Sequence, residues 1–168
     1  MTYPSSRTEN IIDTLWDVEV SDPYRWLEDD RSEETKDWVN RQAEFTKTYL
    51  DSIPVRQILR DRFEKIFDYE KIGVPRKMGG RYFVSKNDGL QNQSVWYVRE
   101  SLHGEDQVFL DPNSLSSDGT VTAYLGSASE DETLLSVIQS SAGSDWQQIH
   151  LYHLATGEPT GEILDWVK

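Results

Sequence analysis

The chain has 168 residues, of which 36% are hydrophobic, so it can bury a modest core as one ordinary domain or two small ones. Its 17 basic and 30 acidic residues give a net charge of -13, and such a surface repels phosphate backbones, so nucleic-acid binding is not expected. The absence of cysteine excludes disulfides and thiolate metal sites, and no apolar stretch approaches the roughly 18 residues of a membrane span. The sequence therefore predicts a cytoplasmic globular protein that does not bind membranes.

Two amphipathic helices are predicted in the first half of the chain. The first begins at Asp30, which can cap free backbone N–H groups while Glu33 occupies the capping-box position, and it runs to about Leu50. The second follows Pro54, a residue suited to the first turn of a helix. The two apolar stripes are formed by Trp38, Val39, Phe45, Tyr49 and Leu50, and by Val55, Ile58, Leu59, Phe63, Ile66 and Phe67. Each stripe needs a surface to pack against, because packing holds most protein helices in place.

Near residues 73–75 the hydrophobic pattern changes from helical to alternating, and a domain boundary is predicted there. The predicted domains are a helical segment at residues 1–72 and an all-β segment at residues 73–168. Short strands are expected at residues 81–85, 95–99, 107–110, 122–125, 134–139, 149–154 and 163–167. The turn-forming residues between them favour antiparallel pairing.

The predicted strands repeat at a spacing close to 50 residues. The spacing is 52 residues from Tyr82 to Leu134, and 54 residues from Tyr97 to Leu151 and from Leu110 to Leu164. Such a period in antiparallel strands indicates propeller blades, and propeller rings close with about four to eight of them. This chain holds about two blades, so we expect it to be a portion of a longer polypeptide. A small open sheet sandwich is the alternative.

No catalytic, cofactor or metal site is predicted. The Gly-x-Ser-x-Gly elbow of α/β-hydrolase peptidases and a phosphate-binding glycine loop are both missing from the sequence. His103 lies in a polar turn, whereas His150 and His153 lie in one strand on opposite faces, which disfavours a shared ligand. The carboxylates at residues 28–30 and 130–132 are interpreted as cap and turn residues, with a weak cation site as the alternative.

The six tryptophans could form a stacking surface for a ligand. Trp38 lies on the first helical stripe and Trp96 lies within a strand, so core packing is favoured for both. Trp26, Trp146 and Trp166 receive no role from the sequence pattern.

Seven stretches of the sequence, in order, resemble the N-terminal signature of prolyl oligopeptidases. They are residues 22–29 (DPYRWLED), 32–36 (SEETK), 68–69 (DY), 89–98 (GLQNQSVWYV), 108–113 (VFLDPN), 116–121 (SSDGTV) and 143–146 (GSDW). The resemblance covers nearly the whole chain. In one departure, Tyr124 stands where the family pattern has a basic residue, so no interdomain ion pair to Asp145 is assigned.

The resemblance implies an α+β portion of a two-domain peptidase. The N-terminal helical segment would belong to an α/β-hydrolase domain, and the first two blades of a seven-bladed β-propeller would follow. The intact protein would be a cytoplasmic, monomeric serine peptidase without cofactors that cleaves short peptides on the carboxyl side of proline. Its catalytic triad would lie beyond residue 168, so this portion alone would be inactive and would need its C-terminal hydrolase domain as partner.

Two alternatives remain at this point. Oligopeptidase B is a related peptidase that cleaves after basic residues, although the stretch at residues 89–98 favours the proline-specific branch. From a different class of function, the chain could be a non-catalytic remnant or a free-standing binding module that holds a partner through unpaired strand edges.

Overall fold

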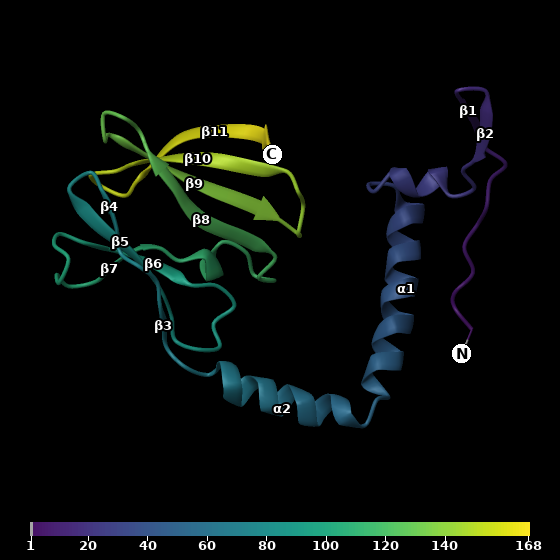
Figure 1. Ribbon diagram of the computed structural model, residues 1–168, viewed down its shortest axis with the longest axis horizontal. Coiled ribbons are helices and arrows are strands. Elements are labelled where there is room, and N and C mark those ends of the chain that lie inside the picture. Colours follow the sequence, from purple (N-terminus) through teal and green to yellow (C-terminus); the bar gives the residue numbers. More distant parts are fainter. Residues whose placement is uncertain (1) are drawn as a thin grey trace. The chain divides into compact units, whose positions relative to one another are not determined.

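The computed structural model describes residues 2–168, which divide into two compact units, one ending at Arg62 and the other beginning at Phe63. The first unit contains β1 (Ile12–Leu15), β2 (Val18–Ser21), the 3-10 helix η1 (Arg25–Glu28) and α1 (Glu33–Asp51). The division falls within α2 (Val55–Phe67), and all remaining strands belong to the second unit (Figure 1). The domain boundary between residues 72 and 73 lies beyond this division and stays a prediction.

Both predicted helices are present, but the cap assigned to the first was wrong: α1 is capped by Ser32, not by Asp30. The Ser32 hydroxyl oxygen accepts a hydrogen bond of 3.1 Å from the backbone N–H of Thr35, one of the donors that the first helical turn leaves free. The chain before Ser32 is a turn, in which the Asp29 carboxylate accepts from the backbone N–H of Arg31 at 3.2 Å. The turn therefore delays the start of the helix beyond Asp30.

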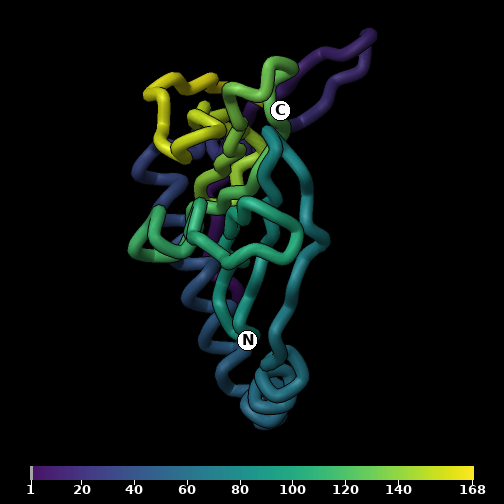
Figure 2. Tube along the Cα trace, turned by 90° about the vertical axis from the view of Figure 1, so that its left-hand side faces the viewer, coloured from purple at the N-terminus to yellow at the C-terminus, as the bar shows by residue number. Residues whose placement is uncertain are grey.

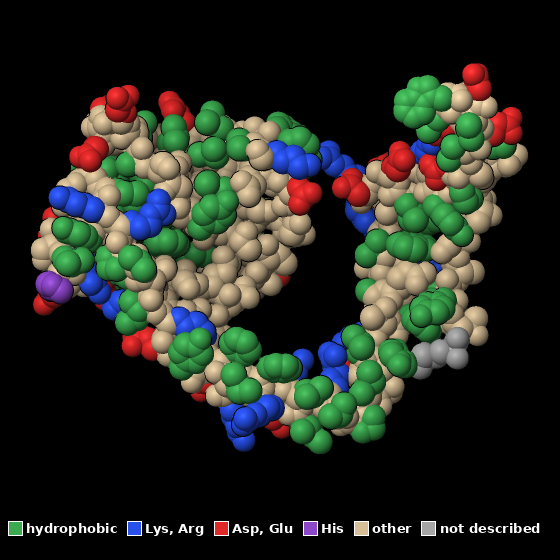
Figure 3. Space-filling model, viewed as in Figure 1, with side chains coloured by type: hydrophobic (Ala, Val, Ile, Leu, Met, Phe, Trp, Pro, Cys, Tyr) green, Lys and Arg blue, Asp and Glu red, His purple; other side chains and the backbone are tan. Residues whose placement is uncertain are grey.

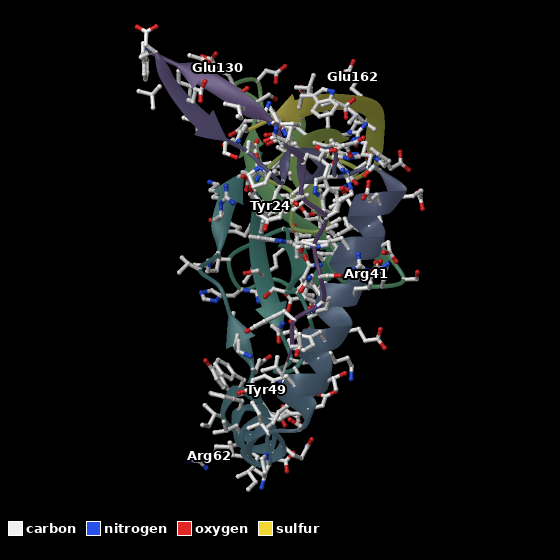
Figure 4. The ribbon with its side chains drawn as sticks, turned by 90° about the vertical axis from the view of Figure 1, so that its right-hand side faces the viewer. Tyr24, Arg41, Tyr49, Arg62, Glu130 and Glu162 are labelled. Atoms are coloured by element: carbon white, nitrogen blue, oxygen red, sulfur yellow. The ribbon has the colours of Figure 1, made fainter. Side chains whose placement is uncertain are left out.

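An extended N-terminal segment runs alongside α1 (Figure 1, Figure 2). Through Tyr3 it covers part of the apolar stripe of that helix. The ring of Tyr3 packs against Phe45 with centroids 5.0 Å apart, and the indole N–H of Trp38 donates to the Ser6 hydroxyl at 2.8 Å. Arg41 donates to a backbone carbonyl of the same segment at 3.2 Å (Figure 4). Trp38 is thus partly buried beside this segment and is not among the residues of the hydrophobic core, so the core packing predicted for it is not confirmed.

The hairpin formed by β1 and β2 was not predicted. Its turn residues, Trp16 and Asp17, have φ values of 49° and 63°, whereas the usual signals for such turns are Asn-Gly and Asp-Gly. Arg25 of η1 forms ion pairs with Asp13 on β1 and with Asp22 beyond β2. The hydrogen bond from Arg25 lowers the pKa of Asp22, so η1 holds the base of the hairpin electrostatically.

Apart from the end of α2, the second unit consists of two antiparallel sheets joined by η2 (Pro112–Ser114). The first sheet contains β3 (Lys71–Ile72), β4 (Arg76–Met78), β5 (Arg81–Asn87), β6 (Val95–Arg99) and β7 (Gln107–Leu110). The second contains β8 (Val121–Ala128), β9 (Leu134–Ser141), β10 (Gln147–His153) and β11 (Pro159–Val167) (Figure 1). All seven predicted strands are present. β6 and β7 have the predicted bounds, β5, β8, β9 and β11 are longer than predicted, and β10 begins two residues and ends one residue earlier than predicted. The short strands β3 and β4, which both pair with β5, were missed.

The two sheets are structural repeats, as the spacing near 50 residues predicted. The paired positions lie on equivalent strands: Tyr82 on β5 and Leu134 on β9, Tyr97 on β6 and Leu151 on β10, Leu110 on β7 and Leu164 on β11. Each sheet is a meander in which these strands pair in chain order. This arrangement is that of successive propeller blades.

One hydrophobic core joins the two sheets. Phe83 of the first sheet and Leu135 and Val137 of the second are fully buried. The ring of Phe109 meets Phe83 edge to face at 5.1 Å, and partly buried Trp96 packs against the same core, as predicted. The second unit is therefore held together mainly by apolar burial.

Asp106, just before β7, organises the charged groups of the first sheet. It accepts a hydrogen bond of 2.6 Å from Arg99 and another from Lys86, and all three side chains are less than a quarter exposed. These two hydrogen bonds hold the pKa of Asp106 below its usual range, and the bond from Arg99 has the larger effect.

Replacing Asp106 by asparagine is expected to lower the free energy of unfolding by about 1 kcal/mol at neutral pH. Because the folded-state pKa of Asp106 is depressed, its stabilisation is fully present above the unfolded-state pKa of about 3.9 and is lost as pH falls through the folded-state value. Urea unfolding at pH 7 and near pH 3 measures the difference between wild type and variant. The exposed neighbour Glu105, changed to glutamine, is the control. A difference that does not shrink on acidification would contradict the assignment.

Candidate functional site

A continuous apolar surface lies along α2. The second predicted stripe forms it, and its members are each 47% to 67% exposed: Val55, Ile58, Leu59, Phe63, Ile66 and Phe67. Hydrophobic side chains gather visibly over this helix (Figure 3). Monomeric proteins rarely expose apolar patches of this kind, and such a patch marks an interaction surface. We call these six side chains the α2 stripe.

A second apolar feature lies beside α1. A groove of about 490 Å³ is lined by Trp38, Val39, Ala43 and Leu50 together with polar side chains. The N-terminal segment covers the part of the stripe around Phe45, whereas Val39 and Tyr49 remain half exposed. The predicted need of both helices for a packing partner is therefore only partly met within this chain.

The histidines occupy the predicted positions. His103 lies in the turn after β6, and His150 and His153 lie on β10. His150 Nε2 is 3.4 Å from the side-chain oxygen of Gln148. Within residues 2–168, the structure brings no three His, Asp or Glu side chains together in a metal-binding arrangement.

The turn role predicted for residues 130–132 is confirmed at Asp131. Its carboxylate accepts hydrogen bonds from the hydroxyls of Ser129 at 2.6 Å and Thr133 at 2.9 Å. These two hydrogen bonds hold the pKa of Asp131 below its usual range, and the bond from Ser129 has the larger effect. The carboxylate therefore stabilises the turn before β9 as an anion.

The tryptophans without a predicted role form two aromatic pairs. Trp26 meets Trp38 edge to face at 6.3 Å. Trp146 and Trp166 lie 5.6 Å apart, also edge to face, and line a cavity of about 220 Å³ with glutamine and serine side chains. The ammonium group of Lys168 lies 5.2 Å from the centre of the Trp146 ring. The pairing depends on contacts between strands and helices distant in sequence, so the sequence pattern contained no signal for it.

Residues 3–168 match the family described as "Prolyl oligopeptidase, N-terminal beta-propeller domain". The chain belongs to the prolyl oligopeptidase family. It is 44% identical over 168 residues to the prolyl endopeptidase of Elizabethkingia meningoseptica, and this match covers all of this chain and 24% of that protein. It is 39% identical over 165 residues to prolyl oligopeptidase A of Amanita bisporigera, and this match covers 89% of this chain and 21% of that protein.

Solved structures of family members have the same fold. One, from a study of two prolyl endopeptidases and their inter-domain dynamics, matches 98% of this chain and 24% of its own with a TM-score of 0.80 and 31% identity. Prolyl oligopeptidase B of Galerina marginata, bound to a 35-residue substrate, matches 99% of this chain and 27% of its own with a TM-score of 0.72 and 27% identity. The chain thus spans about a quarter of the length of its relatives. The helices precede two blades of the family's propeller, as the resemblance implied.

The structure gives Tyr124 on β8 a contact within its own sheet. Its hydroxyl accepts a hydrogen bond of 3.3 Å from the side-chain amide of Gln147. Asp145 is exposed in the turn between β9 and β10. Tyr124 therefore joins two strands of one blade through its hydroxyl.

Within the described residues, no helix is both long enough and apolar enough to cross a membrane.

Proposed function

We propose that this chain is the N-terminal portion of a serine oligopeptidase that hydrolyses short peptides on the carboxyl side of proline. The match of residues 3–168 to the prolyl oligopeptidase family carries this proposal. The reaction would be acyl transfer: a histidine takes the serine proton, an oxyanion hole stabilises the tetrahedral intermediate, and water releases the acyl group. The serine, the acid and the histidine would lie beyond residue 168, so this portion alone would be inactive, and no cofactor would be needed.

In the proposed whole protein, residues 1–72 belong to the α/β-hydrolase domain and residues 73–168 form the first two of seven propeller blades. The exposed α2 stripe supports this arrangement, because a stripe of six apolar side chains needs a packing surface. The hydrolase domain would supply that surface. The propeller would restrict access to the active site to short peptides.

The proposed partners are proline-containing peptides and the hydrolase domain of the same polypeptide, and the whole protein would be a monomer. A cytoplasmic location is supported by the absence of cysteine from the 168 residues. The net charge of -13 disfavours nucleic acids as partners.

Peptide hydrolysis tests the function, and it is measured on the native-length protein, which is the proposed longer polypeptide that begins with this chain. Fluorogenic peptides that differ only in the residue before the scissile bond, proline, alanine or arginine, are compared by kcat/KM. We expect proline to exceed the other two by about 100-fold, because discrimination rests on the fit of one side chain in its pocket. The 168-residue chain alone is expected to cleave none of them.

Three outcomes would contradict the proposal. Preference for arginine would indicate the specificity of oligopeptidase B. A native-length protein without hydrolytic activity would remove the peptidase assignment. An immunoblot of the source cell with an antibody to residues 89–98 that detects a species of 19.4 kDa, and none several times heavier, would indicate a non-catalytic remnant.

A further inference from the structure

β8 lies at the end of the second sheet, so a strand, β9, pairs with only one of its two edges. Along a strand, the backbone groups of alternate residues point to the same side. The edge of β8 that faces away from β9 therefore presents the N–H and C=O groups of Val121, Ala123 and Leu125. Such an edge is a template for pairing with any extended chain.

The side-chain amide of Gln93 binds this edge in the way that a strand would. Gln93 lies in the loop between β5 and β6 of the first blade. Its Nε2 donates to the carbonyl of Val121 at 2.7 Å, and its Oε1 accepts from the N–H of Ala123 at 3.1 Å. The Gln93 amide thus supplies a donor to the C=O of Val121 and an acceptor to the N–H of Ala123, two residues further along β8. The backbone of a neighbouring strand binds an edge in the same way.

Gln93 is itself held in place by Asn113 of η2. The backbone N–H of Gln93 donates to Asn113 Oδ1 at 2.9 Å, and Asn113 Nδ2 donates to the backbone carbonyl of Gln93 at 3.0 Å. This reciprocal pair leaves the Gln93 backbone little freedom to rotate. The loop that carries the Gln93 side chain is therefore held beside β8 before any peptide approaches.

Three further side chains occupy the same edge or its immediate continuation. Their hydrogen bonds are from Asn92 Nδ2 to the Gly119 carbonyl (3.1 Å), from the Val121 N–H to Ser116 Oγ (3.2 Å), and from Arg76 to the carbonyls of Leu125 (3.1 Å) and Gly126 (2.6 Å). Arg76, Asn92 and Gln93 come from the first blade, and Ser116 comes from the link between the blades. Side chains therefore satisfy both polar groups of Val121, the N–H of Ala123 and the carbonyl of Leu125.

We propose that Gln93 and Arg76 close the free edge of β8 against extended peptides. The proposal rests on the proposed function, because a protein that handles flexible peptides brings them close to its own strand edges. Extended peptides bind exposed edges by adding a strand, with affinity from main-chain hydrogen bonds. Side chains that occupy those groups prevent this addition and leave the peptide free to reach the active site.

Gln93→Met in the native-length protein tests this closure. Methionine has a similar length but lacks the amide donor and the amide oxygen. We expect hydrogen exchange at the Ala123 amide to accelerate about tenfold, the loss that one hydrogen bond represents. We also expect a proline-free peptide rich in threonine and valine to bind the variant, and not the wild type, in fluorescence anisotropy.

Gln148→Met is the matched control, because the Gln148 amide donates to the side chain of Asp165 and not to the β8 edge. Wild-type exchange at Ala123 and no peptide binding by Gln93→Met would overturn the proposal. If Gln93→Met does not fold, Arg76→Met opens the other end of the edge, and failure of that variant to bind the peptide overturns the proposal equally. Neither readout involves peptide cleavage, so these results are independent of whether the protein is a peptidase.

Discussion

Replacing Phe83 by alanine is expected to lower the free energy of unfolding by roughly 3–5 kcal/mol, the range for removing a fully buried aromatic ring. Phe83 is 0% exposed and lies where the cores of both blades meet. Its loss also removes the edge-to-face contact with Phe109, whose ring packs against Tyr152 of the second blade at 6.2 Å. The variant should therefore weaken the packing between the two blades as well as the packing within the first blade, which contains Phe83.

Chemical denaturation of the native-length protein, followed by tryptophan fluorescence, measures this loss. Val74→Ala is the control, because Val74 is 85% exposed and its truncation should change stability by less than about 0.5 kcal/mol. Equal stability of the two variants would mean that the blades do not depend on the shared core.

Placing a charge in the α2 stripe is expected to be similarly damaging in the native-length protein. Ile66→Asp should destabilise it by more than about 3 kcal/mol, because docking on the hydrolase domain would bury an unpaired carboxylate. In the 168-residue chain alone the same change should cost little, since Ile66 is 47% exposed there. The contrast between the two lengths isolates the contribution of the proposed packing surface.

Gln57→Glu provides the matched control for this experiment. It adds a negative charge to the same helix nine residues earlier, which at 3.6 residues per turn is the opposite face. Thermal unfolding of both variants in the native-length protein gives the comparison. If Ile66→Asp and Gln57→Glu have the same unfolding temperature, the α2 stripe is not a docking surface. Residues 1–72 then do not belong with the hydrolase domain as proposed.

Helices and strands with strong periodic patterns were predictable from the sequence, and elements without such patterns were not. The alternation in β6 and β7 predicted their bounds, whereas β3 and β4 are too short to show a period. The hairpin of β1 and β2 was missed because Trp16 and Asp17 turn the chain without glycine. The N-cap was misplaced because Asp30 and Ser32 are both good caps, and only the turn before α1 decides between them.

The candidate surfaces divide in the same way. The apolar stripe of α2 was visible in the sequence, because its spacing depends only on helical geometry. Its exposure, the covering of α1 by the N-terminal segment, and the aromatic pair of Trp146 and Trp166 all depend on contacts between distant residues. Spacing along the chain contains no information about such contacts.

By itself, the sequence determined the helical segment, the antiparallel strands, their repeat of about 50 residues and the membership of the prolyl oligopeptidase family. Those properties follow from local periodicity and from contiguous stretches of residues. Only the tertiary structure decided that Gln93 and Arg76 bind the backbone of β8, because a side-chain amide can imitate a strand only when folding brings it 2.7–3.1 Å from the edge. The core that Phe83 shares with Leu135 likewise exists only once the two blades pack together.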